Sequence, residues 1–332
     1  MMPQMKILIC IKRVYKLYFK MMIMKNLYKI SFLVLIGLLV QSCAIVGMQQ
    51  AKKEYSGDYE MHLKPVNDEG YYDMSINVIQ GITSFEDGFF TAQTSASKYL
   101  SINYLDKSGK SLYNHRFNMD SHGQDLSLEQ ISETEVHLFT TIGHYNKDGA
   151  SGIVRLVVTL PMKENGVRDM SKITIAADEE YDLKLRNSTP TINEEKTHFA
   201  IRSGNTIVVA SKADVFKSDL SNAVTFDINK EQLLDGETVL WFQGIAMKND
   251  LVYCYTGNST IDSPKYIYVY NLEGEVVNKH TIDHHDLAKV IGTKNEPEGM
   301  TFVGDDLYYL VMAKAGTGGN IKYLFKLNQN KL

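Results

Sequence analysis

The chain has 332 residues, 44% of them hydrophobic, and its 20 Tyr and 13 Phe can fill a large core, which excludes a disordered protein. With six Pro and 23 Gly, the composition also excludes a collagen-like or low-complexity sequence. The formal net charge is −4, and it becomes −11 without residues 1–42, which hold seven of the 35 basic residues and no acidic one. Because binding to a phosphate backbone needs clustered Lys and Arg, nucleic acid is not an expected partner.

The first 42 residues predict export. Lys25 and Lys29 precede an apolar run over residues 30–40, and a Gln-Ser-Cys sequence that ends at Cys43 follows. A basic segment, an apolar segment of about ten residues and a small residue before the cut describe a secretory signal. Because a cysteine comes directly after the cut, the segment resembles a bacterial lipoprotein signal in which Cys43 takes the lipid. A signal anchor, or an ordinary signal with a chance cysteine, is the alternative.

These boundaries divide the chain into a signal region over residues 1–42, a polar tether over residues 43–58 and a single domain over residues 59–332. We expect an exported protein that is anchored in a membrane through Cys43, on the periplasmic or cell-surface face of an outer membrane. Cys254 is then the other cysteine of the mature chain, which excludes an internal disulfide and a Cys-rich zinc site. Its two flanking tyrosines indicate a buried strand position.

A short phrase recurs along the domain: a polar residue, a glycine, a hydrophobic residue, and then two strand-forming runs separated by a turn. Its clearest copies begin at Glu298-Gly299, Gln243-Gly244 and Gln80-Gly81, and looser copies begin at His122-Gly123 and Thr189-Pro190. Self-similarity at this spacing, in segments rich in β-branched and aromatic residues, is typical of a radial or stacked β-repeat.

Five repeats of up to four strands each follow in chain order. The strands are expected at 81–85, 89–93, 98–104 and 112–117; at 124–129, 136–141, 153–160 and 172–176; at 189–192, 198–202, 206–211 and 223–228; at 244–247, 251–256, 266–271 and 276–282; and at 299–303, 307–312 and 321–327. Residues 231–234 are expected to form one helical turn.

Four strands per repeat match the size of a propeller blade, but the fifth repeat lacks a fourth strand. A spare strand near residues 60–65 can supply it and join the two chain ends, which removes two exposed sheet edges. The sequence therefore predicts an all-β, five-bladed β-propeller, closed in its last blade by an N-terminal strand and monomeric. An irregular β-sandwich is the alternative.

The polar residue of each repeat is a candidate ligand contact. Inner strands of a propeller begin near its axis, and a glycine there lets backbones approach closely. Gln80, His122, Gln243 and Glu298 would then converge on one mouth of the channel, with Trp241 stacking on a sugar ring beside them. Such a ring suits sugar hydroxyls, a phosphate-bearing polymer or a cation. In the structural alternative the polar side chains bond to neighbouring backbone groups, and Trp241 belongs to the core.

Two carboxylates are the weak catalytic candidates. Glu296 and Glu298 lie two residues apart, so an extended segment places them on one face, where His122 is the obvious partner for acid–base chemistry. The same pair can also hold a hard cation in the channel. The sequence over residues 283–286, Asp-His-His-Asp, has metal-like spacing, but it follows an outer strand and is better explained as a solvated loop. We therefore expect no metal site and no cofactor.

Several motifs together resemble a known group. They are SHGQDLSLE over residues 121–129, TPTI over 189–192, FQG over 242–244 and EPEG over 296–299. Their order and spacing are similar to those of the helveticin-like class III bacteriocins, of the teichoic acid biosynthesis protein C-like family and of certain phage receptor-binding proteins. The resemblance implies a five-bladed propeller that engages bacterial envelope polymers, with His122, Gln243 and Glu298 at the motif positions.

The first hypothesis is therefore a lipid-anchored propeller that binds an envelope glycan or polymer without turnover. A hydrolase or esterase that acts on an envelope carbohydrate through Glu298, Glu296 and His122 is the second, and a bacteriocin-like antagonist is the third.

Overall fold

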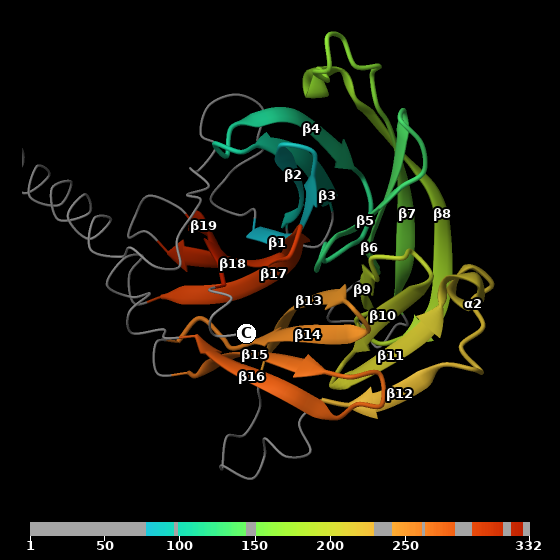
Figure 1. Ribbon diagram of the computed structural model, residues 1–332, viewed down its shortest axis with the longest axis vertical. Helices are drawn as coiled ribbons and strands as arrows, with labels where there is room; N and C mark the ends of the chain where they lie inside the picture. The colour runs from blue at the N-terminus through green and yellow to red at the C-terminus, as the bar shows by residue number, and fades with distance from the viewer. Residues whose placement is uncertain are drawn as a thin grey trace, which may run out of the picture. The chain divides into compact units, whose positions relative to one another are not determined.

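The computed structural model of the chain describes residues 78–95, 99–143, 151–228, 241–260, 263–282, 294–314 and 320–327, all within the unit Gly57–Leu332. These residues form 19 β-strands in five sheets. The sheets are arranged as the blades of a β-propeller (Figure 1). The predicted all-β, five-bladed fold is confirmed.

Each blade is a meander in which strands adjacent in sequence are hydrogen-bonded neighbours. Blades one to three contain β1 (Val78–Phe85), β2 (Gly88–Ser95), β3 (Tyr99–Asp106) and β4 (Ser111–Phe117); β5 (Ser127–Gln130), β6 (Glu135–Ile142), β7 (Ser151–Thr159) and β8 (Thr174–Leu185); and β9 (Thr189–Ile192), β10 (His198–Ser203), β11 (Thr206–Ser211) and β12 (Val224–Asp227). Blades four and five contain β13 (Phe242–Lys248), β14 (Leu251–Thr256), β15 (Lys265–Tyr270) and β16 (Val276–Ile282); and β17 (Asn295–Val303), β18 (Asp306–Lys314) and β19 (Asn320–Lys326).

Residue type explains where these strands form. β14, with the sequence LVYCYT, and β11, with TIVVAS, consist mostly of β-branched and aromatic residues, which favour a pleated, half-buried surface. Asn249 and Asp250 join β13 to β14, and both have positive φ, 50° and 57°, as a type I′ hairpin requires. This two-residue turn fixes the register of the innermost hairpin of blade four.

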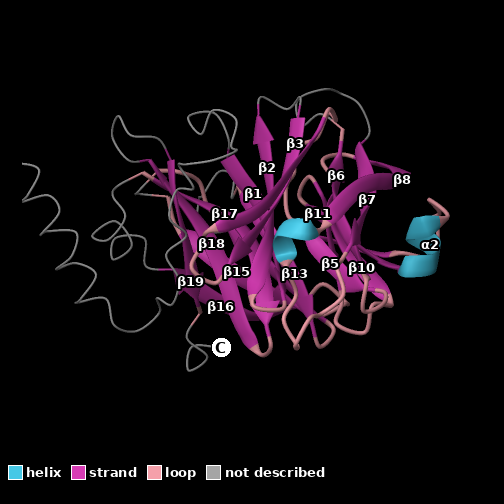
Figure 2. Ribbon diagram, turned by 90° about the horizontal axis from the view of Figure 1, so that it is seen from above, coloured by secondary structure: helices cyan, strands magenta, loops and turns pink. Residues whose placement is uncertain are grey.

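The five inner strands, β1, β5, β9, β13 and β17, form a closed ring. β1 contacts β5 and β17, β9 contacts β5 and β13, and β13 contacts β17. Figure 1 shows these strands around a common centre, with β1 beside β17. In the view of Figure 2 the strands make up almost all of the described structure, and α2 (Lys212–Phe216) lies at its periphery. The contact between the first and last described blades closes the propeller.

Hydrophobic layers fill the space between neighbouring blades. Between blades two and three, Phe139 packs edge-on against Phe199, with 5.0 Å between the ring centroids. Between blades four and five, Tyr255 and Tyr309 meet edge-on at 5.5 Å. Aromatic pairs at these separations contribute about 0.5–1.5 kcal/mol each beyond the area that they bury. Packing between the blades therefore supplies the core.

Among the elements that differ from the sequence prediction are β8 and α2. β8 is much longer than the expected strand at 172–176. The prediction was too short because most side chains of β8 are exposed, so the sequence shows no clear apolar pattern there. α2 is a short helix that the sequence analysis did not predict. Ser211 caps it by accepting a hydrogen bond from the backbone N–H of Asp214, and Phe216 stacks on Tyr181 at 4.8 Å. Cys254 is buried as predicted, and its burial raises the pKa of the thiol.

Several predictions concern residues outside the described ranges. They are the signal region, Cys43, the tether, the spare strand near residues 60–65, the helical turn at 231–234 and the motif at 283–286. The described part of blade five has three strands, β17 to β19. Over the described ranges, no helix is both long enough and apolar enough to cross a bilayer.

Candidate functional site

The glycines of the repeated phrase lie where neighbouring inner strands meet. A Cβ atom added to Gly81 would lie 2.3 Å from the backbone carbon of Asp125, and one added to Gly244 would lie 2.4 Å from the carbonyl oxygen of Glu298. A Cβ on Gly299 would lie 3.1 Å from the Cα of Gly81. Blade one therefore meets blade two and blade five, and blade four meets blade five, through backbone contacts that only glycine permits. The predicted reason for these glycines is confirmed.

We call this region, between the start and the middle of the inner strands and just before β5, the hub. Gln80, Gln243 and Glu298 each precede one of its glycines, so the structure brings these three predicted residues to the same end of the axis. Their side chains are buried, and Glu298 is only 1% exposed. The hub therefore presents little of these three side chains to solvent.

Asp125 is a hub residue that the sequence did not single out. One carboxylate oxygen accepts a hydrogen bond from the N–H of Leu126 at 2.8 Å, and the other accepts from the N–H of Ile245 in blade four at 2.6 Å. Its own N–H donates to the carbonyl oxygen of Gln80 in blade one at 3.2 Å. Burial raises the pKa of this carboxyl well above its usual range, although both donors act in the opposite direction. Asp125 thus ties three blades together across the axis.

Gln124 makes a second set of links. Its amide nitrogen donates to the carbonyl oxygens of Phe242 and Gln243, at 3.4 and 3.3 Å, and its oxygen accepts from the guanidinium of Arg202 at 3.1 Å. The Arg202 guanidinium also lies 4.5 Å from the centre of the Phe242 ring. Blades two, three and four are therefore joined by one buried amide.

His122 does not occupy the place that the alignment of the repeats predicts. Gln124 and Asp125, two residues further along, take the positions that Gln80 and Gly81 hold in blade one, since Asp125 is the residue in contact with Gly81. His122 itself is half-buried in the segment that leads to β5. The alignment of the repeats is wrong here because Gly123 has a different role from the other glycines. It adopts a positive φ of 62° and does not provide a contact between inner strands.

A partly open cluster adjoins the hub between blades four and five, and we call it the rim. Trp241 is 50% exposed, and its carbonyl oxygen accepts from the N–H of Gly257 at 2.7 Å. The amide of Gln243 donates to a carboxylate oxygen of Glu296 at 3.4 Å. The rim thus consists of the half-exposed Trp241, the buried Gln243 and Lys265, and the half-buried Glu296.

Lys265 is a rim residue that sequence reasoning missed. It is fully buried, and its ammonium group donates to the carbonyl oxygens of Thr260 and Ser263 at 3.1 and 3.3 Å. Burial lowers the pKa of Lys265 to about 8, and the charge of Glu296 partly opposes this shift. A lysine that opens an apolar strand, KYIYVY, is the available sequence signal for such a buried cation.

The two predicted carboxylates have different surroundings. A register shift between Pro297 and Met300 interrupts β17, so the simple alternation that would place Glu296 and Glu298 on one face does not hold throughout. Glu296 is half-buried and bonded to Gln243, whereas Glu298 is almost fully buried. Among the described residues, no group of three or more His, Cys, Asp or Glu side chains could hold a metal ion.

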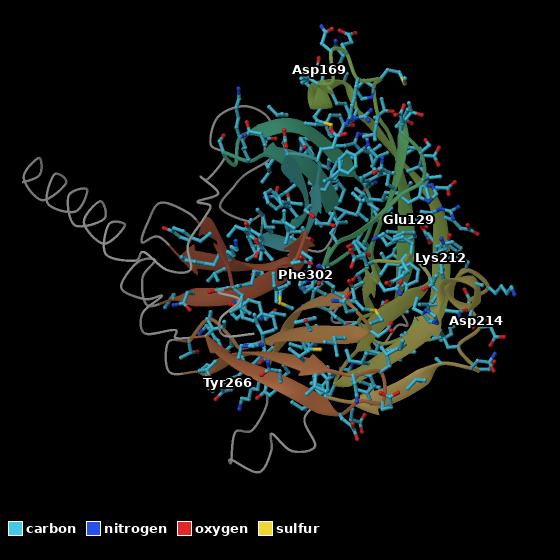
Figure 3. All side chains as sticks on the ribbon, viewed as in Figure 1. Glu129, Asp169, Lys212, Asp214, Tyr266 and Phe302 are labelled. Carbon is cyan, nitrogen blue, oxygen red and sulfur yellow. The ribbon has the colours of Figure 1, made fainter. Side chains whose placement is uncertain are left out.

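At their finishing ends the same inner strands open into a pocket of about 210 Å³, which we call the axial pocket. All five strands line it, and its wall includes Ser84, Leu128, Ile192, Met247 and Phe302. Phe302, on β17, is labelled in Figure 3. The two ends of the axis thus differ, since one is closed by backbone contacts and the other is hollow.

Comparison with known families identifies this architecture. Residues 81–309 match the model of the phage 5-bladed β-propeller receptor-binding platform domain. The chain belongs to this family. The family description names a five-bladed propeller, in agreement with the five described sheets, and a role in receptor binding. The predicted resemblance to phage receptor-binding proteins is confirmed, while the resemblance to helveticin-like and teichoic acid biosynthesis proteins stays a prediction.

Solved structures give the same fold. The tail fibre of Staphylococcus aureus phage P68 is 20% identical with a TM-score of 0.55, and the match covers 82% of this chain and 52% of the tail fibre chain. At this identity the likeness concerns the fold alone, and the chain spans about half the length of the tail fibre. A search of curated proteins gave no match.

Two enzymes are more distant. An exo-β-1,3-galactanase from Phanerochaete chrysosporium is 10% identical, with a TM-score of 0.48 over 82% of this chain and 64% of the enzyme. The GH43_1 enzyme from Xanthomonas citri is 9% identical, with a TM-score of 0.48 over 86% of this chain and 95% of the enzyme. Likeness at this level supports no conclusion about chemistry.

Proposed function

We propose that this propeller binds a glycan or another polymer of a bacterial envelope and leaves it chemically unchanged. The observation that carries the proposal is the match of residues 81–309 to a family of receptor-binding platform domains. A binding platform needs a surface that recognises its receptor, and the motifs of this chain resemble those of propellers that engage envelope polymers.

The rim is the surface that suits a glycan best. Half of Trp241 is exposed, and an aromatic ring with one open face can stack on a sugar ring. The half-buried carboxylate of Glu296, oriented by Gln243, can accept hydrogen bonds from sugar hydroxyls. Gln80 and Glu298 are buried in the hub, so in this proposal they support the fold and do not touch the polymer.

Binding to an array of bacterial envelope polysaccharides, followed by titration of the positive polymers, tests the proposal. Trp241→Ala should weaken binding about tenfold or more, because a central aromatic side chain contributes on the order of 2 kcal/mol to an interface. Its melting temperature should match that of the unchanged protein. Val277→Ala is the matched control, because Val277 is 51% exposed on β16 of the same blade and should bind normally.

Each contrary outcome removes a different part of the proposal. If no envelope polymer binds, the function is wrong. If Trp241→Ala binds as tightly as the unchanged protein, the polymer does not bind at the rim. Release of shortened chains or free sugars from a bound polymer would show turnover and favour the hydrolase hypothesis.

We also propose that the protein is exported and held at a membrane by a lipid on Cys43. The support is the basic and apolar pattern that precedes this residue, which lies outside the described ranges. The mass of the mature N-terminal peptide should include a lipid, and Cys43→Ala should move the protein out of the membrane fraction. An unchanged membrane fraction would contradict the anchor.

A further inference from the structure

The inner strands repeat one position that the recurring phrase does not include. Two positions after Gly81, Asp125, Thr189, Gly244 and Gly299, the chain places a residue that lines the axial pocket. In chain order these residues are Thr83, Ser127, Thr191, Ala246 and Thr301, and we call them the inner ring. Four of the five carry a hydroxyl group. Four different blades thus each contribute a hydroxyl-bearing residue to the lining of the pocket.

The residues of the inner ring are buried, and a buried hydroxyl group normally needs a hydrogen-bond partner. These residues are at most 7% exposed, and Ala246 is 4% exposed. Thr301 uses its hydroxyl oxygen to accept the N–H of Ser84 at 3.1 Å, which joins blades five and one. The hydroxyl of Ser127 has no hydrogen-bond partner among the described residues. Because an unsatisfied buried hydroxyl costs about 1–3 kcal/mol, a partner that the described residues do not supply would stabilise this group.

The lysines at the pocket's opening lie beside carboxylates. The ammonium group of Lys248 lies 2.7 Å from a carboxylate oxygen of Asp305 and also donates to the carbonyl oxygen of Gly304 at 2.6 Å. Lys196 interacts with the carboxylates of Glu129 and Glu194. Glu129 is itself paired with Lys212 at 2.5 Å, and both are labelled in Figure 3. Each of these lysines is therefore engaged by carboxylates of the protein itself.

We propose that the axial pocket binds a neutral, hydroxyl-rich molecule of the size of one sugar ring, through the hydroxyls of the inner ring. Hydroxyl groups both donate and accept, so a ring of them matches a polyol better than it matches an ion. Pockets for drug-sized ligands span about 300–1,000 Å³, and 210 Å³ suits a smaller molecule. Because the rim and the axial pocket lie at opposite ends of the inner strands, this site does not depend on polymer binding at the rim.

Saturation-transfer NMR on the full chain tests the site. D-Glucose, D-galactose and glycerol serve as neutral probes, and D-glucose 6-phosphate serves as the charged one. At least one neutral probe should bind saturably. Ser127→Ala and Thr191→Val should each weaken that binding about two- to tenfold, the loss expected for one hydrogen bond. Ser127→Ala removes a hydroxyl with no described partner, so its melting temperature should not fall.

Trp241→Ala is the control that separates the two sites, because it should leave the binding of these small probes unchanged. The proposal is overturned if no neutral probe binds, or if only D-glucose 6-phosphate does. It is also overturned if Ser127→Ala and Thr191→Val both bind as the unchanged protein does. Failure of polymer binding at the rim, with small-probe binding intact, would count against the proposed function alone.

Discussion

The two ends of the inner strands use the same five blades in opposite ways. At the hub, glycine backbones touch, and buried polar side chains such as Gln124 and Asp125 bond from blade to blade. At the axial pocket the strands have separated enough to leave about 210 Å³ of space, and hydroxyl groups line it. Twisted strands cannot stay equally close along their whole length, so convergence at one end accompanies an opening at the other.

The difference indicates that one end of the axis stabilises the fold and the other end is available for binding. At the hub, the side chains of Gln124 and Asp125 form hydrogen bonds to other blades, which stabilises the ring. A polar group of the axial pocket, the Ser127 hydroxyl, has no partner among the described residues. Substitutions at the hub should therefore change stability first, whereas substitutions in the pocket should change binding first.

The largest expected effect is that of Gly81→Ala at the hub. The new Cβ would lie 2.3 Å from the backbone carbon of Asp125, and backbone cannot move aside as a flexible side chain can. We expect a loss of about 3 kcal/mol or more in the free energy of unfolding, measured by denaturant titration.

Gly204→Ala is the matched control for this substitution. Gly204 has a φ of 61°, and a Cβ atom added to it would meet no other atom within 4 Å. Only the left-handed backbone conformation therefore opposes the change, at about 1–2 kcal/mol. Equal losses for the two variants would mean that the glycine contact does not hold the hub together.

A smaller loss is expected for Asp125→Ala. The substitution leaves the N–H groups of Leu126 and Ile245 without their acceptor, but it also removes a carboxyl group whose ionised form is disfavoured by burial. We expect a net loss of about 2–3 kcal/mol in the free energy of unfolding.

Asp250→Ala controls for the backbone conformation, because Asp250 has a φ of 57° against 58° for Asp125 and its side chain is exposed. Its loss should be smaller by at least about 1 kcal/mol. If the two aspartate variants were equally stable, the link across the axis would contribute nothing.

The smallest expected effect is the pH dependence of stability that Lys265 produces. Burial lowers the pKa of this lysine from 10.5 to about 8, so between these pH values the unfolded chain binds more protons than the folded one. Stability should therefore rise with pH in this window, by about 1–2 kcal/mol between pH 7.5 and 9.5 from this group. Denaturant titrations at several pH values measure the slope.

Lys265→Met is the comparison for that slope, because it keeps a long side chain and removes the titrating group. The rise between pH 7.5 and 9.5 should be smaller in this variant. The same slope in both proteins would show that the ammonium group of Lys265 is not desolvated in the fold.

Much of the architecture follows from local patterns. The runs at β11 and β14 are strands by composition, the Asn249-Asp250 turn sets a hairpin, and the glycines after Gln80, Gln243 and Glu298 mark the hub. The weakest prediction was the one that relied on alignment of the repeats alone. His122-Gly123 matches the phrase by residue type, yet Gln124 and Asp125 hold the equivalent positions.

The sequence by itself determined the repeat, the number of blades and the glycine contacts of three inner strands, because turn chemistry and strand-forming runs act over a few neighbouring residues. Only the tertiary structure decided that Gln80 and Glu298 are buried, that Asp125 reaches blade four, and that an inner ring of hydroxyls surrounds a pocket. Burial and bonding across the axis depend on how five distant segments meet, and no single segment contains that information.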